Sequence, residues 1–161
     1  MMSAPSYAAG VPGSIDWAAK KPLRRPRPIT PTPPMSLIRA FVVEDSPVIR
    51  DNLVSALEEL VPLKVVGWAD DEAGALRWLG DPANGCDLAI LDIFLRTGSG
   101  TGILRALRDA GSPLRRVVLT NYASPDLARQ CLDLGAVRVF DKSRDIDALI
   151  NYCAALPPPP A

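Results

Sequence analysis

Five short apolar runs, each followed by a longer amphipathic segment, constrain the fold of this chain more than any other feature. The runs are almost continuously apolar, as expected of strands that are buried on both faces of a parallel sheet. Between them, apolar residues recur at the three- and four-residue spacing of helices that cover such a sheet. The runs occupy residues 38–43, 64–68, 88–91, 117–119 and 137–140.

This alternation predicts an α/β fold, in which a doubly wound, five-stranded parallel sheet carries helices on both faces. Parallel strands are joined by right-handed crossovers, so covering both faces requires the winding to reverse once. In such sheets, ligands bind beyond the carboxyl ends of the strands, at the reversal. The residues that directly follow each strand are therefore the candidates for a functional site.

Local signals mark the ends of several predicted helices. Ser46-Pro47 and Ser124-Pro125 each combine an N-cap serine with a proline suited to the first helical turn. Gly111 and Gly135 are typical of positions just past a helix. The side chains predicted to face the core are Ile49, Leu53, Ala56, Leu57 and Leu60 in the first helix, and Leu127, Ala128, Cys131 and Leu132 in the fourth.

Both ends of the chain are rich in proline. Residues 1–35 contain eight prolines, and five basic side chains against one acidic give this segment a net charge of +4. Such composition predicts a disordered basic tail. One interpretation is that translation starts at Met35, and the other is that the tail is a tether. The predicted folded domain spans residues 36–156, and a second proline-rich tail spans residues 157–161.

The charge and hydropathy of the whole chain bear on its location and partners. Its 18 basic and 18 acidic residues give a formal net charge of zero. Direct DNA binding is not expected, because nucleic-acid-binding domains usually present excess positive charge. No apolar run reaches the roughly 18 residues of a membrane helix, and the first ten residues do not resemble a secretory signal. These features predict a cytoplasmic protein without a membrane segment.

The chain contains no histidine and three cysteines, Cys86, Cys131 and Cys153, with no Cys-x-x-Cys motif. The absence of histidine excludes histidine-containing zinc sites and Ser-His-Asp triads. The odd cysteine count favours reduced thiols that pack as small apolar groups. Any chemistry must therefore use carboxylates, hydroxyls and lysine.

Polar side chains follow four of the five predicted strands. In a parallel sheet, the carboxyl ends of the strands lie at one edge, so these side chains are expected to surround one crevice. They are Glu44 and Asp45 after the first strand, Asp92 after the third, Thr120 at the end of the fourth, and Asp141 and Lys142 after the fifth.

Clustered carboxylates repel one another unless a cation lies among them, and Mg²⁺ is the natural choice for oxygen ligands. Phosphoryl transfer needs positioning and neutralisation of charge on the phosphoryl oxygens. Asp92 is placed to act as a nucleophile, with the Thr120 hydroxyl and the Lys142 ammonium bound to those oxygens. Each residue alone has an ordinary structural explanation, but their combination at one edge favours this chemistry.

Four segments, VVEDSPVIR, LAILDIFLRTGSGTGILRAL, VVLTNYAS and VFDKS, resemble the receiver domain of bacterial two-component response regulators. The resemblance covers roughly residues 36–156 and implies a flavodoxin-like sheet with strand order 2-1-3-4-5. It implies a phosphoacceptor at Asp92, Mg²⁺ (or Mn²⁺) bound by Glu44, Asp45, Asp92 and the backbone carbonyl of Phe94, and Thr120 with Lys142 as the phosphate-sensing pair.

The chain departs from the family's pattern at several positions. Val139 stands where the family usually has its switching aromatic residue, and the neighbouring Phe140 is expected to face the other side of the strand. In the family, an aromatic side chain at this position usually moves together with the switch threonine, here Thr120. With valine at position 139, that coupled movement is not expected. Further departures are Glu44 for the more frequent aspartate, Arg96 and Ser143 for common prolines, and Asn121 for a small residue.

Phe94 and Tyr122 occupy positions that, in the family, influence access of the hydrolytic water. Bulky groups there predict slow dephosphorylation, although either ring could simply pack against its neighbours. Trp68 and Trp78 are expected to be core or half-buried anchors.

The resemblance implies a single-domain response regulator. A sensor histidine kinase or a histidine phosphotransfer protein would donate the phosphoryl group, and the surface of the fourth helix and fifth strand would change for an unknown target protein. Only 19 residues follow Lys142, so no attached output domain is expected. The resemblance also allows a homodimer through the last two helices.

Two other functions compete with the switch. The first is a receiver-like binding module that works without phosphorylation, which Val139 and Asn121 favour. The second is a phosphatase of the haloacid-dehalogenase type, which also uses an aspartate nucleophile with Mg²⁺. That family has a second acid two residues after the nucleophile, where this chain has Phe94.

Overall fold

The computed structural model describes residues 36–159, and the structural statements below refer to that part of the chain. The tail predicted at residues 1–35 lies outside the described residues. Strands and helices alternate: β1 (Ile38–Val43), α2 (Pro47–Leu60), β2 (Leu63–Ala69), α3 (Glu72–Leu79), β3 (Leu88–Leu91), α4 (Gly100–Asp109), β4 (Arg115–Thr120), α5 (Pro125–Asp133), β5 (Arg138–Asp141) and α6 (Ile146–Ala154).

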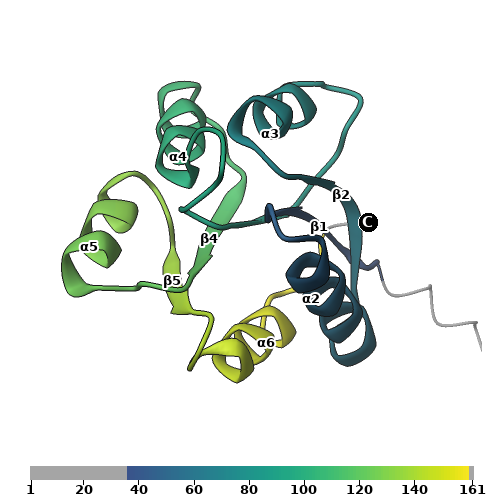
Figure 1. The fold of residues 1–161 in the computed structure, drawn as a ribbon. Helices are drawn as coiled ribbons and strands as arrows, with labels where there is room; N and C mark the ends of the chain where they lie inside the picture. Colours follow the sequence, from purple (N-terminus) through teal and green to yellow (C-terminus); the bar gives the residue numbers. More distant parts are fainter. Residues whose placement is uncertain (1–35, 160–161) are drawn as a thin grey trace, which may run out of the picture. The chain divides into compact units, whose positions relative to one another are not determined.

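The five strands form one sheet in the order β2-β1-β3-β4-β5, and every neighbouring pair is parallel. The predicted α/β class and strand order are therefore confirmed. The winding reverses between β1 and β3. Helices α2 and α6 cover one face of the sheet, and α3, α4 and α5 cover the other (Figure 1).

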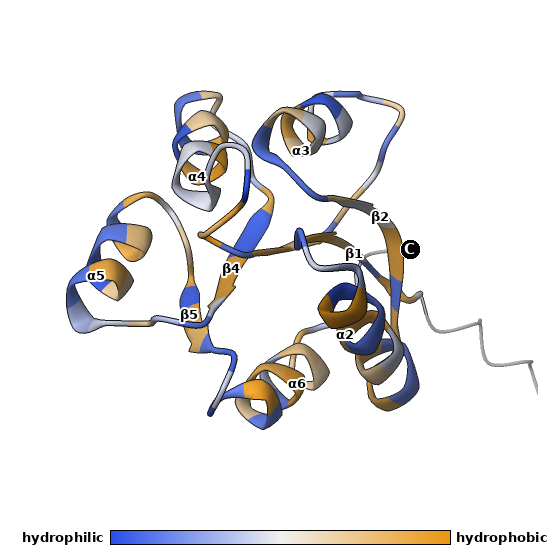
Figure 2. Cartoon of the chain, in the orientation of Figure 1, coloured by the Kyte–Doolittle hydropathy of each residue, from blue (hydrophilic) through white to orange (hydrophobic). Residues whose placement is uncertain are grey.

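Each face of the sheet has its own apolar core. Figure 2 shows strands that are largely hydrophobic, with hydrophilic segments on β4 and β5, between helices that combine hydrophobic and hydrophilic residues. Alternate residues of β1 contribute to the two cores, Ala40 and Val42 to one and Phe41 and Val43 to the other. Cys153 belongs to the first core and Cys131 to the second, and all three cysteines are free thiols, as predicted.

The predicted inward face of α2 is wrong in part. Leu53 and Leu57 are buried as predicted, but Ile49 and Leu60 are 40% and 60% exposed. The helix also buries Arg50, which was not predicted. The guanidinium of Arg50 lies 3.6 Å from the centre of the Trp68 ring and donates to the Glu44 carbonyl at 3.4 Å. A charged residue with these two partners thus occupies a buried position of the helix.

Two other expectations about packing have different outcomes. Leu132 of α5 is 48% exposed, because its neighbour Cys131 takes the core position, so its predicted burial is wrong. Trp78 stacks on Phe41 with ring centres 4.4 Å apart, as expected of an anchor, whereas Trp68 is 52% exposed and carries Arg50 on its ring.

Strand β2 contains a β-bulge where it pairs with β1. Ala40 pairs with Val65, but the next residue of β1, Phe41, pairs with Gly67, so Val66 has no partner. Side chains of a strand point alternately to the two faces of the sheet, and the extra residue Val66 reverses this alternation in the second half of β2. Each residue of β2 therefore faces the same core as its partner on β1. Beyond the bulge, the Ala69 carbonyl accepts a hydrogen bond from the Glu44 amide at 3.0 Å, which fixes the start of the loop after β1.

The predicted helix caps are present. The hydroxyl of Ser46 accepts from the Ile49 amide, and that of Ser124 accepts from the Leu127 amide. None of the helices within residues 36–159 is long and apolar enough to cross a membrane.

Candidate functional site

The loops that follow β1 and β3 meet at the carboxyl edge of the sheet and bring three carboxylates together. Glu44, Asp45 and Asp92 each have a carboxylate oxygen within 4.8 Å of the others. Glu44 is 3% exposed and Asp92 is 6% exposed, and Asp45 is half-buried. The structure therefore brings together the three side chains that the sequence predicts to share one site.

Lys142 extends from the end of β5 into the same cluster. Its Nζ donates to Asp92 Oδ2 at 2.7 Å and also to Glu44 Oε2, and its side chain is 9% exposed. Burial lowers the pKa of the Lys142 ammonium, but the hydrogen bonds to the two carboxylates outweigh burial and the net pKa is raised. Burial raises the pKa of Glu44 despite its bond to Lys142. The site therefore contains three acids and one firmly charged ammonium.

Thr120 ends β4 beside this cluster and is fully buried. Its Oγ1 has no hydrogen-bond partner among the described residues, although its carbonyl accepts from the Lys142 amide at 2.9 Å. A buried hydroxyl without a partner is costly, so such groups usually have a functional explanation. This hydroxyl is free to bond to a group that enters the site.

The loop between β3 and α4 holds two of the carboxylates through its backbone. The Phe94 amide donates to Asp92 Oδ1 at 3.2 Å, and the Arg96 amide donates to Asp45 Oδ2 at 2.9 Å. The Arg96 side chain is mostly exposed, with Nε 4.0 Å from Asp45 Oδ2. Arg96 thus positions Asp45 through its amide, a role that sequence reasoning missed because a backbone contact leaves no signal in side-chain type.

The donor set fits a hard divalent cation. Three carboxylates lie close together with a single ammonium, which leaves an excess of negative charge, and all their donor atoms are oxygens. When bound, Mg²⁺ would neutralise part of this charge and polarise an oxygen that enters the site. Glu44, Asp45 and Asp92 are the side chains that would hold it.

Asp141 is not part of this cluster, although it follows the same edge of the sheet. Its carboxylate accepts from the Ser143 amide and hydroxyl, and its own amide donates to Asp145. The hydrogen bonds from Ser143 lower the pKa of Asp141. Asp141 therefore shapes the turn that presents Lys142 rather than adding a fourth acid to the site.

Two exposed aromatic rings lie next to the acidic cluster. Phe94 is 54% exposed and Tyr122 is 74% exposed, and their ring centres are 6.0 Å apart in an edge-to-face arrangement. On β5, Val139 packs against the core on the α4 and α5 side, whereas Phe140 is buried in the opposite core. The prediction that Phe140 faces away from Val139 is confirmed.

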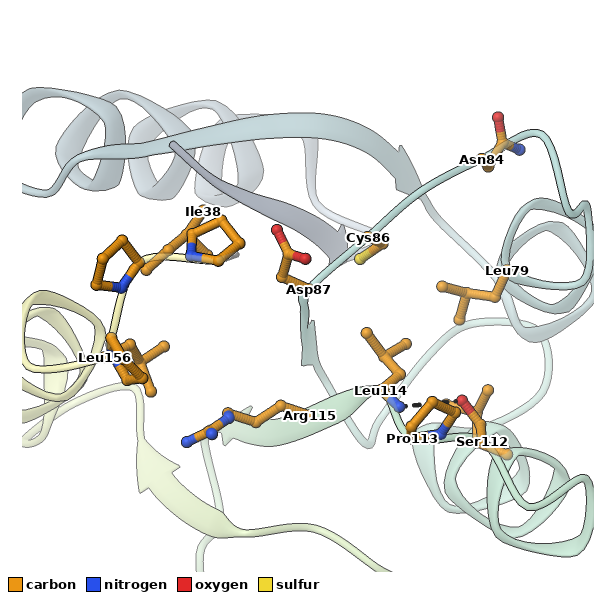
Figure 3. Close-up of a pocket in the computed structure, with 14 residues that line it drawn as sticks. Ile38, Leu79, Asn84, Cys86, Asp87, Ser112, Pro113, Leu114, Arg115 and Leu156 are labelled. Carbon is orange, nitrogen blue, oxygen red and sulfur yellow. Dashed lines mark hydrogen bonds between the residues drawn. The ribbon is translucent and has the colours of Figure 1, made fainter. Parts of the chain in front are cut away.

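A separate cavity of about 510 Å³ opens at the other edge of the sheet (Figure 3). Ile38, Asp87 and Arg115, which line it, lie at the amino ends of β1, β3 and β4. Its lining contains none of the three clustered carboxylates, nor Thr120 or Lys142. The acidic site lies at the opposite edge of the sheet and is separate from this cavity.

The comparisons with known proteins agree with this arrangement. Residues 40–154 match the response regulator receiver domain. The chain belongs to the response regulator receiver family. Its fold is also that of the signal receiver domain of the response regulator NarL from Mycobacterium tuberculosis, with a TM-score of 0.64 and 27% identity over 75% of this chain and 99% of that chain.

Curated relatives of this receiver carry different activities in their names. The DNA-binding transcriptional activator DevR/DosR of Mycobacterium tuberculosis is 34% identical over 100 residues, which cover 62% of this chain and 45% of that protein. The protein-glutamate methylesterase/protein-glutamine glutaminase 5 of Myxococcus xanthus is 34% identical over 109 residues, which cover 67% of this chain and 31% of that protein. The receiver thus spans about half of the first relative and less of the second, so neither named activity transfers to it.

Proposed function

We propose that this receiver accepts a phosphoryl group on Asp92 from a sensor histidine kinase or a histidine phosphotransfer protein. Mg²⁺, or Mn²⁺, would be held by Glu44, Asp45, Asp92 and the backbone carbonyl of Phe94. The single observation that carries the proposal is Lys142, whose ammonium bonds to both Asp92 and Glu44 inside the acidic cluster.

In this proposal, a carboxylate oxygen of Asp92 bonds to phosphorus as the bond from phosphorus to the donor nitrogen breaks. The Lys142 ammonium pairs with one phosphoryl oxygen, and the unpartnered Thr120 hydroxyl donates to another. The acyl phosphate adds negative charge next to Thr120, which ends β4, and Lys142, which directly follows β5. This charge draws the loop after β4 inward and changes the surface of α5 and β5, where a target protein would bind.

We also propose the bounds, the location and the partners of the switch. The receiver domain is proposed to span residues 36–156 and to act in the cytoplasm through protein partners, without direct DNA binding or a membrane anchor. Pairing through α5 and α6 would give a homodimer. Action without an attached output domain stays a prediction, and the mass of the protein detected by antibody in its source cells tests it.

The first experiment measures intact mass after incubation with acetyl phosphate and Mg²⁺. We expect a gain of one phosphoryl group that requires Mg²⁺ and is abolished by Asp92→Asn. Asp126→Asn is the matched control, since the Asp126 side chain is 94% exposed on α5. A wild-type chain that gains no phosphoryl group, or an Asp92→Asn chain that still does, contradicts the proposal.

A binding module that does not switch is the second candidate, and Val139 supports it because no aromatic residue occupies that position on β5. Heteronuclear NMR with beryllofluoride separates the two. If beryllofluoride changes the chemical shifts of backbone amides from Asp92 into β5 and α5, the switch is favoured. If the chemical-shift changes are confined to the acidic cluster, the constitutive module is favoured. Steady turnover of a phosphate ester by the protein would instead indicate a phosphatase.

A further inference from the structure

Glu72, the first residue of α3, makes two contacts with the loop that joins β3 to α4. Its carboxylate accepts from the Ser99 amide at 3.0 Å, and its own amide lies 3.4 Å from the Thr97 carbonyl that accepts from it. The residue is half-buried. One side chain from a different β–α unit therefore fastens the far end of the loop that begins at Asp92.

Two glycines, Gly98 and Gly102, leave space for the Glu72 carboxylate because neither has a side chain. A Cβ added at Gly102 would lie 2.1 Å from Glu72 Oε1, and one added at Gly98 would lie 2.6 Å from Oε2. Both distances are far below van der Waals contact. The two glycines therefore form a cradle that is filled by Glu72 and that a side chain at either position would disturb.

Electrostatics favour an acid at this place. Ser99 is the N-cap of α4, and its hydroxyl accepts from the Gly102 amide at 3.1 Å. The Glu72 carboxylate thus lies at the amino end of α4, where the helix dipole stabilises negative charge. A charged acceptor also makes the bond from the Ser99 amide stronger than a neutral one would.

The loop fastened in this way carries groups of the acidic site. Phe94 pairs with Ser99 in an isolated β-bridge, and the Gly100 amide donates to the Ile93 carbonyl at 3.0 Å, which closes the loop on itself. Movement of Ser99 would therefore shift Phe94, whose amide bonds to Asp92 and whose carbonyl is the expected fourth metal ligand. Glu72 reaches the site through the backbone alone.

We propose that Glu72 is a positioning residue for divalent-cation binding, because its hold on Ser99 sets the position of Phe94 in the acidic site. This inference rests on the proposed function, since it concerns the same cation. Glu72 does not touch Asp92. Replacing Glu72 should therefore change the dissociation constant of the cation more than the rate at which Asp92 accepts the phosphoryl group.

The first test measures the Mg²⁺ dissociation constant of the full chain by calorimetry, in Glu72→Ala and Glu72→Gln. Removing the acceptor should weaken binding about tenfold, the lower end of the loss seen when a residue bonded directly to a metal ligand is removed, because Glu72 acts on the Phe94 ligand through Ser99. Glutamine keeps an oxygen for the Ser99 amide and should restore most of the affinity. At saturating Mg²⁺, the Glu72→Ala chain should still reach full modification by acetyl phosphate.

Glu58→Ala is the matched control. The Glu58 carboxylate also accepts from a backbone amide at 3.0 Å, that of Val65, but it joins α2 to β2 away from the loop. This variant should lose thermal stability to a similar degree and keep the wild-type Mg²⁺ affinity. Equal affinity in Glu72→Ala and Glu58→Ala would overturn the inference and leave Glu72 as a packing contact.

Gly102→Ala provides an independent test, because alanine normally stabilises a helix relative to glycine. In the wild-type background, the added methyl displaces the Glu72 carboxylate, so Mg²⁺ affinity should fall. In the Glu72→Ala background the space is empty, so the same change should raise the melting temperature without a further loss of affinity. Additive losses in the double variant would overturn the inference.

The proposed function fails separately from this inference. If the wild-type chain neither binds Mg²⁺ nor gains a phosphoryl group, the proposed function is overturned, and the role of Glu72 with it. If the wild type does both and the Glu72 and Gly102 variants match it in Mg²⁺ affinity, only the inference is overturned.

Discussion

The Thr120 hydroxyl is buried without a hydrogen-bond partner in the described part of the chain, so it costs folding free energy in the unphosphorylated state. Thr120→Val removes the polar atom at nearly constant shape. We expect the free energy of unfolding to stay equal or rise by about 1 kcal/mol, measured by urea denaturation. Thr120→Ser is the control that keeps the hydroxyl. A clear loss of stability in Thr120→Val would show that the hydroxyl has a partner in solution.

Lys142, unlike Thr120, stabilises the folded chain, because its ammonium compensates the negative charge of two buried carboxylates, Glu44 and Asp92. Lys142→Met should reduce the free energy of unfolding at pH 7 by about 3 kcal/mol, since it leaves carboxylates buried without their cation. Added Mg²⁺ should recover part of this loss. Lys64→Met is the control, because the Lys64 side chain is 62% exposed. Equal stability of the two variants would contradict a structural role of the Lys142 charge.

Phe94 and Tyr122 are exposed beside Asp92, so their rings are in a position to limit the approach of water to an acyl phosphate. We expect Phe94→Asn to speed loss of the phosphoryl group about tenfold, equivalent to about 1.4 kcal/mol of barrier. Tyr122→Phe keeps a ring and should change little. The decay is followed by intact mass after the phosphodonor is removed, and an unchanged rate would leave Phe94 as a packing residue.

At the scale of the elements, Gly111 and Gly135 end α4 and α5 with φ angles of +66° and +104°. Gly111→Ala should cost about 1 kcal/mol of stability, the penalty for a side chain in the left-handed region. Gly135→Ala should cost more, because its Cβ would also lie 2.6 Å from Nη1 of Arg116. Urea denaturation of both variants tests this order, and a smaller loss for Gly135→Ala would contradict it.

The resemblance to receiver domains supplied the strand order and the local chemistry of serine and proline supplied the two helix caps, whereas the periodicity of the sequence predicted the strands themselves. It also predicted the acidic cluster, since strand ends share an edge in a parallel sheet. The faces of α2 and α5 were less predictable: Ile49, Leu60 and Leu132 suit an inward face as well as their buried neighbours do. The stack of Arg50 on Trp68 belongs to the first case, and it is a tertiary contact without a sequence period.

Glu72 shows a further limit of sequence reasoning. It lies in the acidic run from Asp70 to Glu72, which is ordinary for a helix start, and Gly98 and Gly102 look like loop flexibility. Only the fold shows that the two glycines face this one carboxylate. A pair of glycines spaced four residues apart around an N-cap serine is a weak signal that could have drawn attention to a close approach.

At the scale of the whole molecule, two cores share one sheet, and Cys153 is fully buried in one of them, whereas Cys86 packs at the margin of the other. Burial raises the pKa of Cys86 and of Cys153 to about 11. An unfolded thiol ionises near pH 8.5. The unfolded chain therefore binds fewer protons than the native chain above that pH, and this contribution to stability is complete below about pH 8.5 and is lost as pH rises toward 11.

Cys153→Ala tests this linkage by urea denaturation at pH 8 and pH 10. The difference in free energy of unfolding between the wild type and the variant should be smaller at pH 10 than at pH 8, by on the order of 1 kcal/mol. The reason is that only the wild type has a thiol at position 153 whose protonated state stabilises the folded chain. Other groups that titrate in this range cancel in the comparison. A difference that is constant with pH would contradict the buried, protonated state of Cys153.

The unpaired Val66 divides the edge strand β2 into two stretches of opposite phase. Deleting Val66 would leave each stretch paired with β1 as it is, whereas deleting a residue within the second stretch would invert its faces and move the Ala69 carbonyl away from the Glu44 amide. The bulge is thus a place where this strand can change length by one residue without disturbing the acidic loop. A one-residue deletion can therefore be accommodated at the bulge, whereas a deletion elsewhere in the second stretch cannot.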